Sequence, residues 1–316
     1  MSMIAGAPVI SPPPASARRP SWSVMIPTYN CAGYLRRTLE SVLRQDPGPE
    51  LMQIEVVDDC STRDDPEAVV NELGRGRVQF YRQPQNVGAI TNFNTCIQRS
   101  TGQLVHILHG DDLVADGFYE QLGAPLLQND DLGAACCRQT YITESGQPLL
   151  TTRPELPRPG VWAEALDVLA VSNRIQPPAL VVKRAVYEQL GGFNPSLFHS
   201  ADWEMLVRLA AHTGIFYHSE PLARYRVHTA SDTSRLLQTG ANMQDARRCI
   251  QIFSDYLPAH RAAGLARRAY GYLVLVGLRR AGQAAIKGRA GIAAIQLREA
   301  AICAGQALFP ARASQP

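Results

Sequence analysis

The chain has 316 residues, of which 46% are hydrophobic and 19% are charged, and its formal net charge is +3 at pH 7. This composition is typical of a folded globular protein and excludes an intrinsically disordered one. The net charge is too small to indicate a nucleic-acid-binding surface, so no nucleic-acid partner is expected.

Strand-like and helix-like segments alternate through the N-terminal part of the chain. Short apolar runs that end in polar or turn-forming residues predict strands at residues 22–27, 52–59, 78–81 and 104–112. Apolar residues at helical spacing, or capping residues, predict helices at residues 33–45, 65–73 and 116–127, with a loop entering another helix at 86–98. This order predicts an α/β fold with a mostly parallel central sheet and helices on both faces.

The middle of the chain is harder to assign. The region from Cys136 to Pro178 contains six prolines and is predicted to include loops that face a substrate, while residues 179–183 predict another short strand. A glycine-containing turn then leads into an amphipathic helix, for which Ser200 is the expected N-cap. Asp202 lies in the first turn of this helix, at the edge of a face that is otherwise apolar.

Polar side chains follow three of the predicted strands, at Thr28-Tyr29-Asn30, Asp58-Asp59 and Asp111-Asp112. Taken one at a time, such residues often cap helices or form turns. Ligands of open α/β sheets, however, bind at the carboxyl ends of the strands. Three polar clusters at these ends together favour a nucleotide-type binding site.

The cysteines and the N-terminus indicate where the protein functions. Seven cysteines occur without a paired C-x-x-C spacing, so neither a disulfide framework nor a structural zinc site is expected, and a cytoplasmic location is predicted. Residues 1–21 contain several prolines and no sustained apolar segment, which predicts a disordered leader rather than a signal peptide.

Six short motifs occur in order: IPTYN at 26–30, VVDDCSTRD at 56–64, NVG at 86–88, HGDD at 109–112, LGGFNPSL at 190–197 and SADWEMLVRLA at 200–210. Together they resemble the motifs of inverting family 2 glycosyltransferases, which have the Rossmann-like GT-A fold. The resemblance implies a catalytic domain over residues 22–235. It also implies that a sugar moves from a nucleoside-diphosphate sugar to an acceptor hydroxyl with inversion.

The resemblance implies that three groups of residues bind the donor nucleotide. Pro27, Thr28 and Tyr29 are expected to line the pocket. Asp58 and Asp59 are expected to contact the base and ribose, and Asn86 and Gly88 are expected to shape the pocket wall. Carboxylates suit the second role because they accept hydrogen bonds from ribose hydroxyls and base N–H groups. Glycine suits the third because it allows the backbone to approach a ligand closely.

A divalent cation, Mg²⁺ or Mn²⁺, is the cofactor that the resemblance implies. Asp111 corresponds to the metal-binding aspartate of the family's DxD motif, and Asp112 lies beside it. Hard cations bind carboxylate and diphosphate oxygens together. His109 stands where the first aspartate of the motif is expected, so metal binding is expected to rest on Asp111 with help from His109, Asp112 or His228. His228 lies where many members of the family have a histidine after an arginine-rich strand.

Asp202 matches the general base of the family. A carboxylate that takes the proton from an acceptor hydroxyl contributes a factor of about 10²–10⁴ to the rate. A single displacement inverts the anomeric configuration and requires no nucleophilic carboxylate. The alternative is that Asp202 only interacts favourably with the positive end of its own helix.

Other signals are less specific. Arg224 and Arg226 are weaker candidates for contacts with the diphosphate. Trp162 and Trp203 could stack on sugar rings, although packing in the core explains them equally well. The arginine that often follows NVG in the family is absent, and Phe93 lies in that region.

The C-terminal region is strongly basic. Residues 258–316 contain nine Lys/Arg and one acidic residue, a net charge of +8, and residues 236–316 are predicted to form a helical extension. This extension either packs on the catalytic domain or lies against the anionic inner face of the plasma membrane. The second alternative suits a transferase that builds cell-surface polysaccharide or another glycan on a glycan or lipid-linked acceptor.

The same residues argue against other functions. Sugar-nucleotide pyrophosphorylases and dinucleotide dehydrogenases need a glycine-rich loop after the first strand, which IPTYN lacks. A non-catalytic alternative is a degenerate transferase that only binds nucleotide-sugar, for which His109 is the motive. The presence of both Asp111 and Asp202 argues against it.

Overall fold

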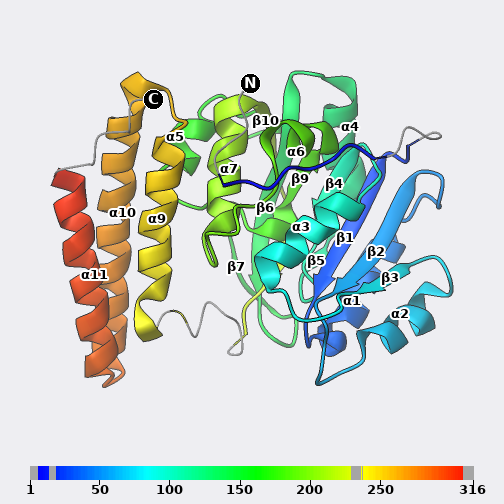
Figure 1. Cartoon of the computed structure of the whole chain (residues 1–316), viewed down its shortest axis with the longest axis horizontal. Coiled ribbons are helices and arrows are strands. Elements are labelled where there is room, and N and C mark those ends of the chain that lie inside the picture. The colour runs from blue at the N-terminus through cyan, green and yellow to red at the C-terminus, as the bar shows by residue number, and fades with distance from the viewer. Residues whose placement is uncertain (1–5, 14–18, 229–235, 237, 309–316) are drawn as a thin grey trace. The chain divides into compact units, whose positions relative to one another are not determined.

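The computed structural model describes residues 6–13, 19–228, 236 and 238–308 (Figure 1). The chain divides into two compact units. The first comprises Met1–Ala163, Ile175–Pro195 and Thr213–Val227, and the second comprises Glu164–Arg174, Ser196–His212 and His228–Pro316. Two segments of the middle region, residues 164–174 and 196–212, thus group with the C-terminal helices.

The first unit is built on a ten-stranded sheet in the order β3-β2-β1-β4-β9-β6-β10-β5, with β7 beside β6 and β8 beside β10. The strands are β1 (Trp22–Thr28), β2 (Met52–Asp58), β3 (Gln79–Arg82), β4 (Leu104–Ile107), β5 (Leu113–Val114), β6 (Leu132–Ile142), β7 (Pro148–Thr151), β8 (Gly160–Val161), β9 (Leu180–Lys183) and β10 (Gly214–Arg226). The four parallel pairs (β1 with β2 and β4, β2 with β3, and β6 with β10) are each longer than the antiparallel pairs. The expected mostly parallel sheet is thus confirmed.

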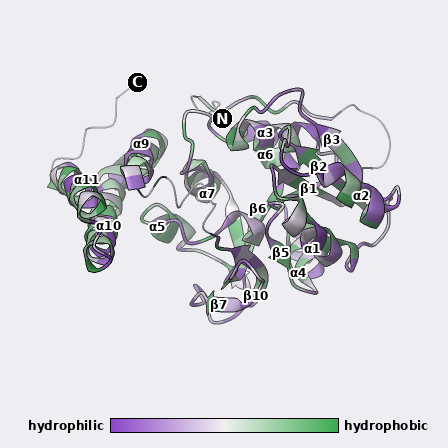
Figure 2. Ribbon diagram, turned by 90° about the horizontal axis from the view of Figure 1, so that it is seen from below, coloured by the Kyte–Doolittle hydropathy of each residue, from purple (hydrophilic) through white to green (hydrophobic). Residues whose placement is uncertain are grey.

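Helices cover both faces of this sheet, as predicted. They are α1 (Ala32–Leu43), α2 (Pro66–Gly74), α3 (Ala89–Arg99), α4 (Phe118–Gln128) and α6 (Arg184–Leu190). Figure 2 shows α3 and α6 on one side of the strands and α1 and α4 on the other. All seven residues of β1 are buried, which requires cover on both sides and explains why this strand reads as a continuous apolar run.

The middle region contains more regular structure than the sequence predicts. Strand β6, the second-longest of the sheet, occupies the start of the segment for which loops were expected, and β7, β8, α5 (Ala165–Leu169) and the short 3₁₀ helix η1 (Pro177–Ala179) follow. The sequence of β6, LGAACCRQTYI, is rich in small residues and has few β-branched ones, so its strand propensity is weak. Its pairing with β9 and β10 stabilises the strand, which its local propensity does not favour.

Residues 6–13 differ from the expected disordered leader. The carbonyl of Pro8 accepts a hydrogen bond from Gly192 N (2.9 Å), and that of Val9 accepts one from Gln98 Nε2 (2.7 Å). Ile10 is 2% exposed. Composition alone missed this ordering, because the partners lie far away in the sequence.

The second unit is helical and contains the predicted C-terminal helices. It comprises α5, α7 (Ala201–His212), α9 (Ala241–Ser254), α10 (Ala259–Ile286) and α11 (Ala290–Leu308). Helices α10 and α11 pack closely at Gly277, where an added Cβ atom would come within 2.9 Å of Ala300 Cβ. Among the described residues, no helix combines the length and the apolar character needed to span a bilayer.

His106 in β4 predicts a pH dependence of stability. It is fully buried, its Nε2 lies 3.1 Å from the carbonyl oxygen of Pro178, and burial lowers the pKa of His106 to about 3. Between that value and the unfolded pKa of about 6.5, the unfolded chain binds a proton that the folded chain does not. Stability is therefore full above pH 6.5 and falls with decreasing pH, by about 2 kcal/mol between pH 7.5 and pH 5.

Urea unfolding at these two pH values measures the effect. His106→Leu is expected to flatten the pH dependence, whereas replacement of an exposed histidine, His260→Gln, leaves it unchanged. The same slope in His106→Leu and in the unmodified protein would contradict the prediction.

Candidate active site

The loops after β1 and β2 are tied to each other. The side-chain oxygen of Asn30 accepts hydrogen bonds from the backbone N–H groups of Thr62 and Arg63, both at 2.9 Å. Asp64 accepts a hydrogen bond from Ala32 N (2.7 Å) at the start of α1. The motifs IPTYN and VVDDCSTRD therefore form one surface at the carboxyl edge of the sheet.

Asp59 holds the NVG segment in place. Its two carboxylate oxygens accept hydrogen bonds from Val87 N (2.7 Å) and Gly88 N (3.0 Å), and Asn86 Nδ2 donates to its carbonyl oxygen (3.1 Å). Burial raises the pKa of Asp59, and the charge of Asp58 adds to this, while the two backbone hydrogen bonds oppose it. Gly88 has a φ of 85°, a backbone conformation that favours glycine.

Asp58 is fully buried and already has several partners. It accepts hydrogen bonds from Arg82 Nε (2.7 Å) and from Ser61 Oγ (2.5 Å). These hydrogen bonds hold the loop after β2 in place. The contact of Asp58 with a base or ribose stays a prediction. Of the residues predicted to line the pocket, Thr28 is buried, whereas Tyr29 is exposed and accessible to a ligand.

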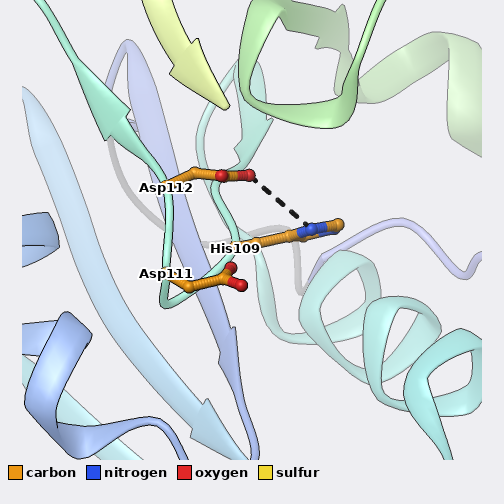
Figure 3. A group of neighbouring side chains, drawn as sticks. All are labelled: His109, Asp111 and Asp112. Atoms are coloured by element: carbon orange, nitrogen blue, oxygen red, sulfur yellow. Dashed lines mark ion pairs between the residues drawn. The ribbon is translucent and has the colours of Figure 1, made fainter. Parts of the chain in front are cut away.

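His109, Asp111 and Asp112 form a cluster after β4 (Figure 3). One ligand atom from each residue can be chosen so that all lie within 4.8 Å of one another. Gly110 allows this loop to approach β1, because a Cβ atom there would lie 2.7 Å from Thr28 Cγ2. The Gly110 N–H also donates to the carbonyl oxygen of Pro27 (3.0 Å).

Asp112 is the buried member of this cluster. Its Oδ1 accepts a hydrogen bond from Arg226 N (2.8 Å), while its Oδ2 lies 3.8 Å from His109 Nδ1 and has no hydrogen-bond partner among the described residues. Burial raises the pKa of Asp112, and the charge of Asp111 raises it further. A buried carboxylate oxygen without a donor, beside a second carboxylate and an imidazole, fits a divalent cation such as Mn²⁺ or Mg²⁺.

Arg226, at the end of β10, supports the loop that contains Asp111. Its Nε donates to the carbonyl oxygen of Asp111 (2.6 Å), and its Nη1 donates to those of Thr143 (3.0 Å) and Glu144 (2.8 Å). The guanidinium lies 4.9 Å from the centre of the Tyr34 ring, and burial lowers the pKa of Arg226. From the sequence, Arg226 is only a weaker candidate for contact with the diphosphate, and no motif indicates its role in holding the loop.

Arg226→Lys keeps the charge but cannot reach all three carbonyl groups. We expect the free energy of unfolding to fall by about 1–3 kcal/mol, because three part-buried hydrogen bonds lose a charged donor. Urea unfolding measures this, and Arg224→Lys, at an exposed position of the same strand, is the control. Equal stability of the two variants would contradict the assigned role.

Phe93 stacks on His109, with ring centroids 4.8 Å apart and an interplanar angle of 21°, and Phe193 contacts the edge of Phe93. The ring of Phe93 therefore fixes the orientation of the imidazole that replaces the expected aspartate. In the sequence, Phe93 stands out only as a departure from the family pattern. A motif shows which residue is present but not which ring lies against it.

Asp202 lies in the first turn of α7, in the second unit. Ser200 is the N-cap, since its carbonyl oxygen accepts the first helical hydrogen bond from Glu204 N (3.0 Å). The two carboxylate oxygens of Asp202 accept hydrogen bonds from Trp203 N (2.8 Å) and from Asn173 Nδ2 (2.9 Å). Asn173, in the loop after α5, was missed because no motif contains it.

The remaining predicted site residues have different surroundings. Trp162 and Trp203 are 3% and 4% exposed, and Trp203 Nε1 donates to the carbonyl oxygen of Leu169 (2.6 Å), so both pack in the core. His228 follows β10 and belongs, like Asp202, to the second unit, whereas the cluster of His109, Asp111 and Asp112 belongs to the first. The role of His228 as a metal ligand stays a prediction.

Residues 23–188, which include all of β1 except Trp22, all of β2 and the cluster after β4, match the model of glycosyl transferase family 2. The chain belongs to this family. It is 26% identical over 223 residues to an uncharacterized glycosyltransferase of Rickettsia typhi, covering 69% of this chain and 67% of that protein. It is 25% identical over 221 residues to the chondroitin synthase of Pasteurella multocida, covering 69% of this chain but 22% of the synthase.

Solved structures of low sequence identity show the same fold. Residues 1–349 of TarS from S. aureus, in complex with UDP-GlcNAc, superpose with a TM-score of 0.59 at 14% identity, covering 90% of this chain and 91% of that one. A mannosyltransferase from Pyrobaculum calidifontis, in complex with GDP-Man and Mn²⁺, superposes with a TM-score of 0.54 at 17% identity, covering 95% and 90%. The predicted GT-A fold is thereby confirmed. The assignment of the protein as a glycosyltransferase is supported by the family match over residues 23–188.

Proposed function

We propose that this family 2 glycosyltransferase is inverting and metal-dependent and transfers a sugar from a nucleoside-diphosphate sugar to an acceptor hydroxyl. The observation that carries the proposal is the cluster of His109, Asp111 and Asp112 at the carboxyl end of β4. These three residues are proposed to hold the cation, with His228 as a further predicted ligand. A bound cation would neutralise charge on the leaving diphosphate.

Asp202 is proposed to be the general base. The acceptor oxygen forms a bond to the anomeric carbon while the bond from that carbon to the diphosphate oxygen breaks. Asp202 takes the proton of the acceptor hydroxyl, and the electron pair of the broken bond leaves with the nucleoside diphosphate. The hydrogen bonds from Asn173 and Trp203 orient the carboxylate for this step.

The donor class is proposed from the residues after β1 and β2 and from the related structures. The nucleotide is proposed to bind at Pro27, Thr28 and Tyr29, with the loops held by Asp58 and Asp59 around it. UDP-GlcNAc and GDP-Man are the ligands in the complexes of TarS and of the mannosyltransferase. The likeness to a chondroitin synthase supports a role in cell-surface polysaccharide or glycan synthesis, with a glycan or lipid-linked acceptor.

A screen of the purified protein tests this function. UDP-, GDP- and dTDP-sugars are offered with Mn²⁺, Mg²⁺ or EDTA, and thermal protection and release of nucleoside diphosphate are measured. Binding and turnover that require a divalent cation support the proposal. The absence of binding by any of these donors with any cation would refute it. Metal-dependent binding without turnover would favour the degenerate, non-catalytic alternative that His109 motivates.

Peripheral contact with an anionic membrane at the inner face of the plasma membrane is proposed for the C-terminal helices. Large apolar side chains are exposed on α10 together with arginines: Tyr272, Leu275, Leu278 and Ile286, with Arg267, Arg268 and Arg279. Helix α10 contains no Asp or Glu, so nothing on it repels an anionic surface. Exposed apolar groups beside cations are what such a surface binds.

Flotation with vesicles of phosphatidylglycerol and phosphatidylcholine tests this contact. We expect the full chain to float at low salt and to be released at high salt, because the arginine contribution is screened. Arg267→Gln with Arg279→Gln is expected to weaken flotation, whereas Arg63→Gln, in the first unit, leaves it unchanged. Flotation that is equal for all three proteins, or absent for the full chain, would rule the contact out.

A further inference from the structure

The loop that precedes α7 is held by a residue of the C-terminal extension. Asp245, on α9, accepts hydrogen bonds from three successive backbone N–H groups, those of Phe198 (3.3 Å), His199 (2.9 Å) and Ser200 (2.7 Å). Asp245 is 2% exposed. One buried carboxylate thus satisfies three donors immediately before the helical turn that carries Asp202.

This arrangement fixes where α7 begins. Ser200 is the N-cap of the helix, and its N–H is the one that lies closest to Asp245. Cys249, one turn further along α9, contributes a weak hydrogen bond from its Sγ to the Ser200 carbonyl oxygen (3.6 Å). Both backbone groups of the N-cap residue are therefore bound by α9, and Asp202 follows two residues later.

We propose that Asp245 is a positioning residue for Asp202, so that the C-terminal extension is part of the catalytic apparatus. The inference rests on the proposed function, in which Asp202 is the general base. Asn173 orients the carboxylate of Asp202 through a direct hydrogen bond, while Asp245 holds the backbone from which that carboxylate projects. Neither residue lies in a motif by which the family is recognised.

Loss of Asp245 has two consequences. The N–H groups of residues 198–200 lose their buried acceptor, so the loop gains freedom to move. The first turn of α7 then holds Asp202 less accurately against the acceptor hydroxyl. A displacement of about 1 Å at a reacting group costs up to about 100-fold in rate.

The test compares variants at two positions of the same helix. Asp245→Ala removes the acceptor. Asp245→Asn keeps the shape of the side chain and one acceptor oxygen, so it separates the loss of the acceptor from a failure to fold. The matched control is Arg247→Met. Arg247 pairs with Glu299 of α11, so this variant weakens the extension without touching the loop before α7.

Hydrogen–deuterium exchange and steady-state kinetics are then measured on the full chain, with the donor found in the screen above and with Asp202→Asn in parallel. In Asp245→Ala, exchange at residues 198–200 is expected to accelerate about tenfold or more, because these amides lose a charged acceptor. Its kcat is expected to fall about 10- to 100-fold, with the KM for donor within about twofold, since the donor binds elsewhere. In Asp245→Asn, the exchange rate and kcat should lie between those of Asp245→Ala and those of the unmodified protein. Arg247→Met should change neither quantity by more than about threefold.

The outcomes separate this inference from the proposed function. If Asp202→Asn is inactive but Asp245→Ala and Arg247→Met have the same kcat, the positioning role is wrong while the function stands. If exchange at residues 198–200 is unchanged in Asp245→Ala, the inference also fails. If Asp202→Asn retains the kcat of the unmodified protein, the proposed base is wrong and the inference falls with it.

Discussion

Asp202→Asn is expected to lower kcat by about 10²–10⁴-fold while binding of the nucleotide-sugar donor is retained. The amide keeps the shape of the carboxylate and can still accept the hydrogen bond from Trp203 N, but it cannot take a proton from an acceptor hydroxyl. The loss should therefore appear in kcat and hardly in the KM for donor. Steady-state kinetics, with donor affinity measured by calorimetry, check the prediction.

Asp255→Asn is the matched control for Asp202→Asn. Asp255 is exposed at the end of α9, so this variant makes the same change of charge in the second unit without altering a proposed catalytic group. It should have the kcat of the unmodified protein. Equal losses in both variants, or a weakened donor affinity in Asp202→Asn with kcat preserved, would contradict the assignment of the base.

Asp111→Asn is expected to reduce metal-dependent turnover by about 100- to 1,000-fold and to raise the Mn²⁺ concentration that gives half-maximal activity. A neutral amide is a poorer ligand for a hard cation, and the loss of several kcal/mol of transition-state stabilisation corresponds to this factor. The buried carboxylate of Asp112 would then share the cation with His109 alone among the cluster residues. Titration of turnover with Mn²⁺ measures both quantities.

The control for this second variant is Asp116→Asn, a few residues further along the same segment. Asp116 is exposed and lies 3.6 Å from Arg44 in a surface ion pair, which contributes little to stability. Its replacement should leave the Mn²⁺ titration unchanged. A midpoint that is the same in Asp111→Asn as in the unmodified protein would show that the cation, if required, binds elsewhere.

The half of the sheet that carries β1 to β4 could be predicted because β1, β2 and β4 are short apolar runs that end in polar residues. β1 is buried throughout and β2 nearly so, and such strands have a pattern that sequence reasoning can detect. β6 could not be predicted, because its small residues have weak strand propensity and its stability comes from β9 and β10. The order of Ile10 likewise depends on contacts that are distant in the sequence.

The residues of the candidate site likewise divide into those that the sequence indicates and those that it does not. The motif HGDD indicated His109, Asp111 and Asp112 as candidate ligands, and in the structure one ligand atom of each residue lies within 4.8 Å of the others. The supporting residues could not be found, because Arg226 acts through carbonyl groups of other loops. Asn173 could not be found because its side chain donates a hydrogen bond to Asp202, which lies 29 residues further along the chain. A motif identifies groups that react, whereas the groups that hold them are determined by tertiary contacts.

The position of strand β9 in the sheet affects how the polypeptide folds while it is being synthesised. This strand is the antiparallel link between β4 and β6, and it forms both pairs only once Leu180–Lys183 has been synthesised. On the ribosome, β1 to β4 can pair long before that point, so the free side of β4 is exposed while the middle region is being made. An unpaired strand edge invites pairing with another chain. A fragment that ends before Leu180 is therefore expected to aggregate, although it contains the complete cluster of His109, Asp111 and Asp112.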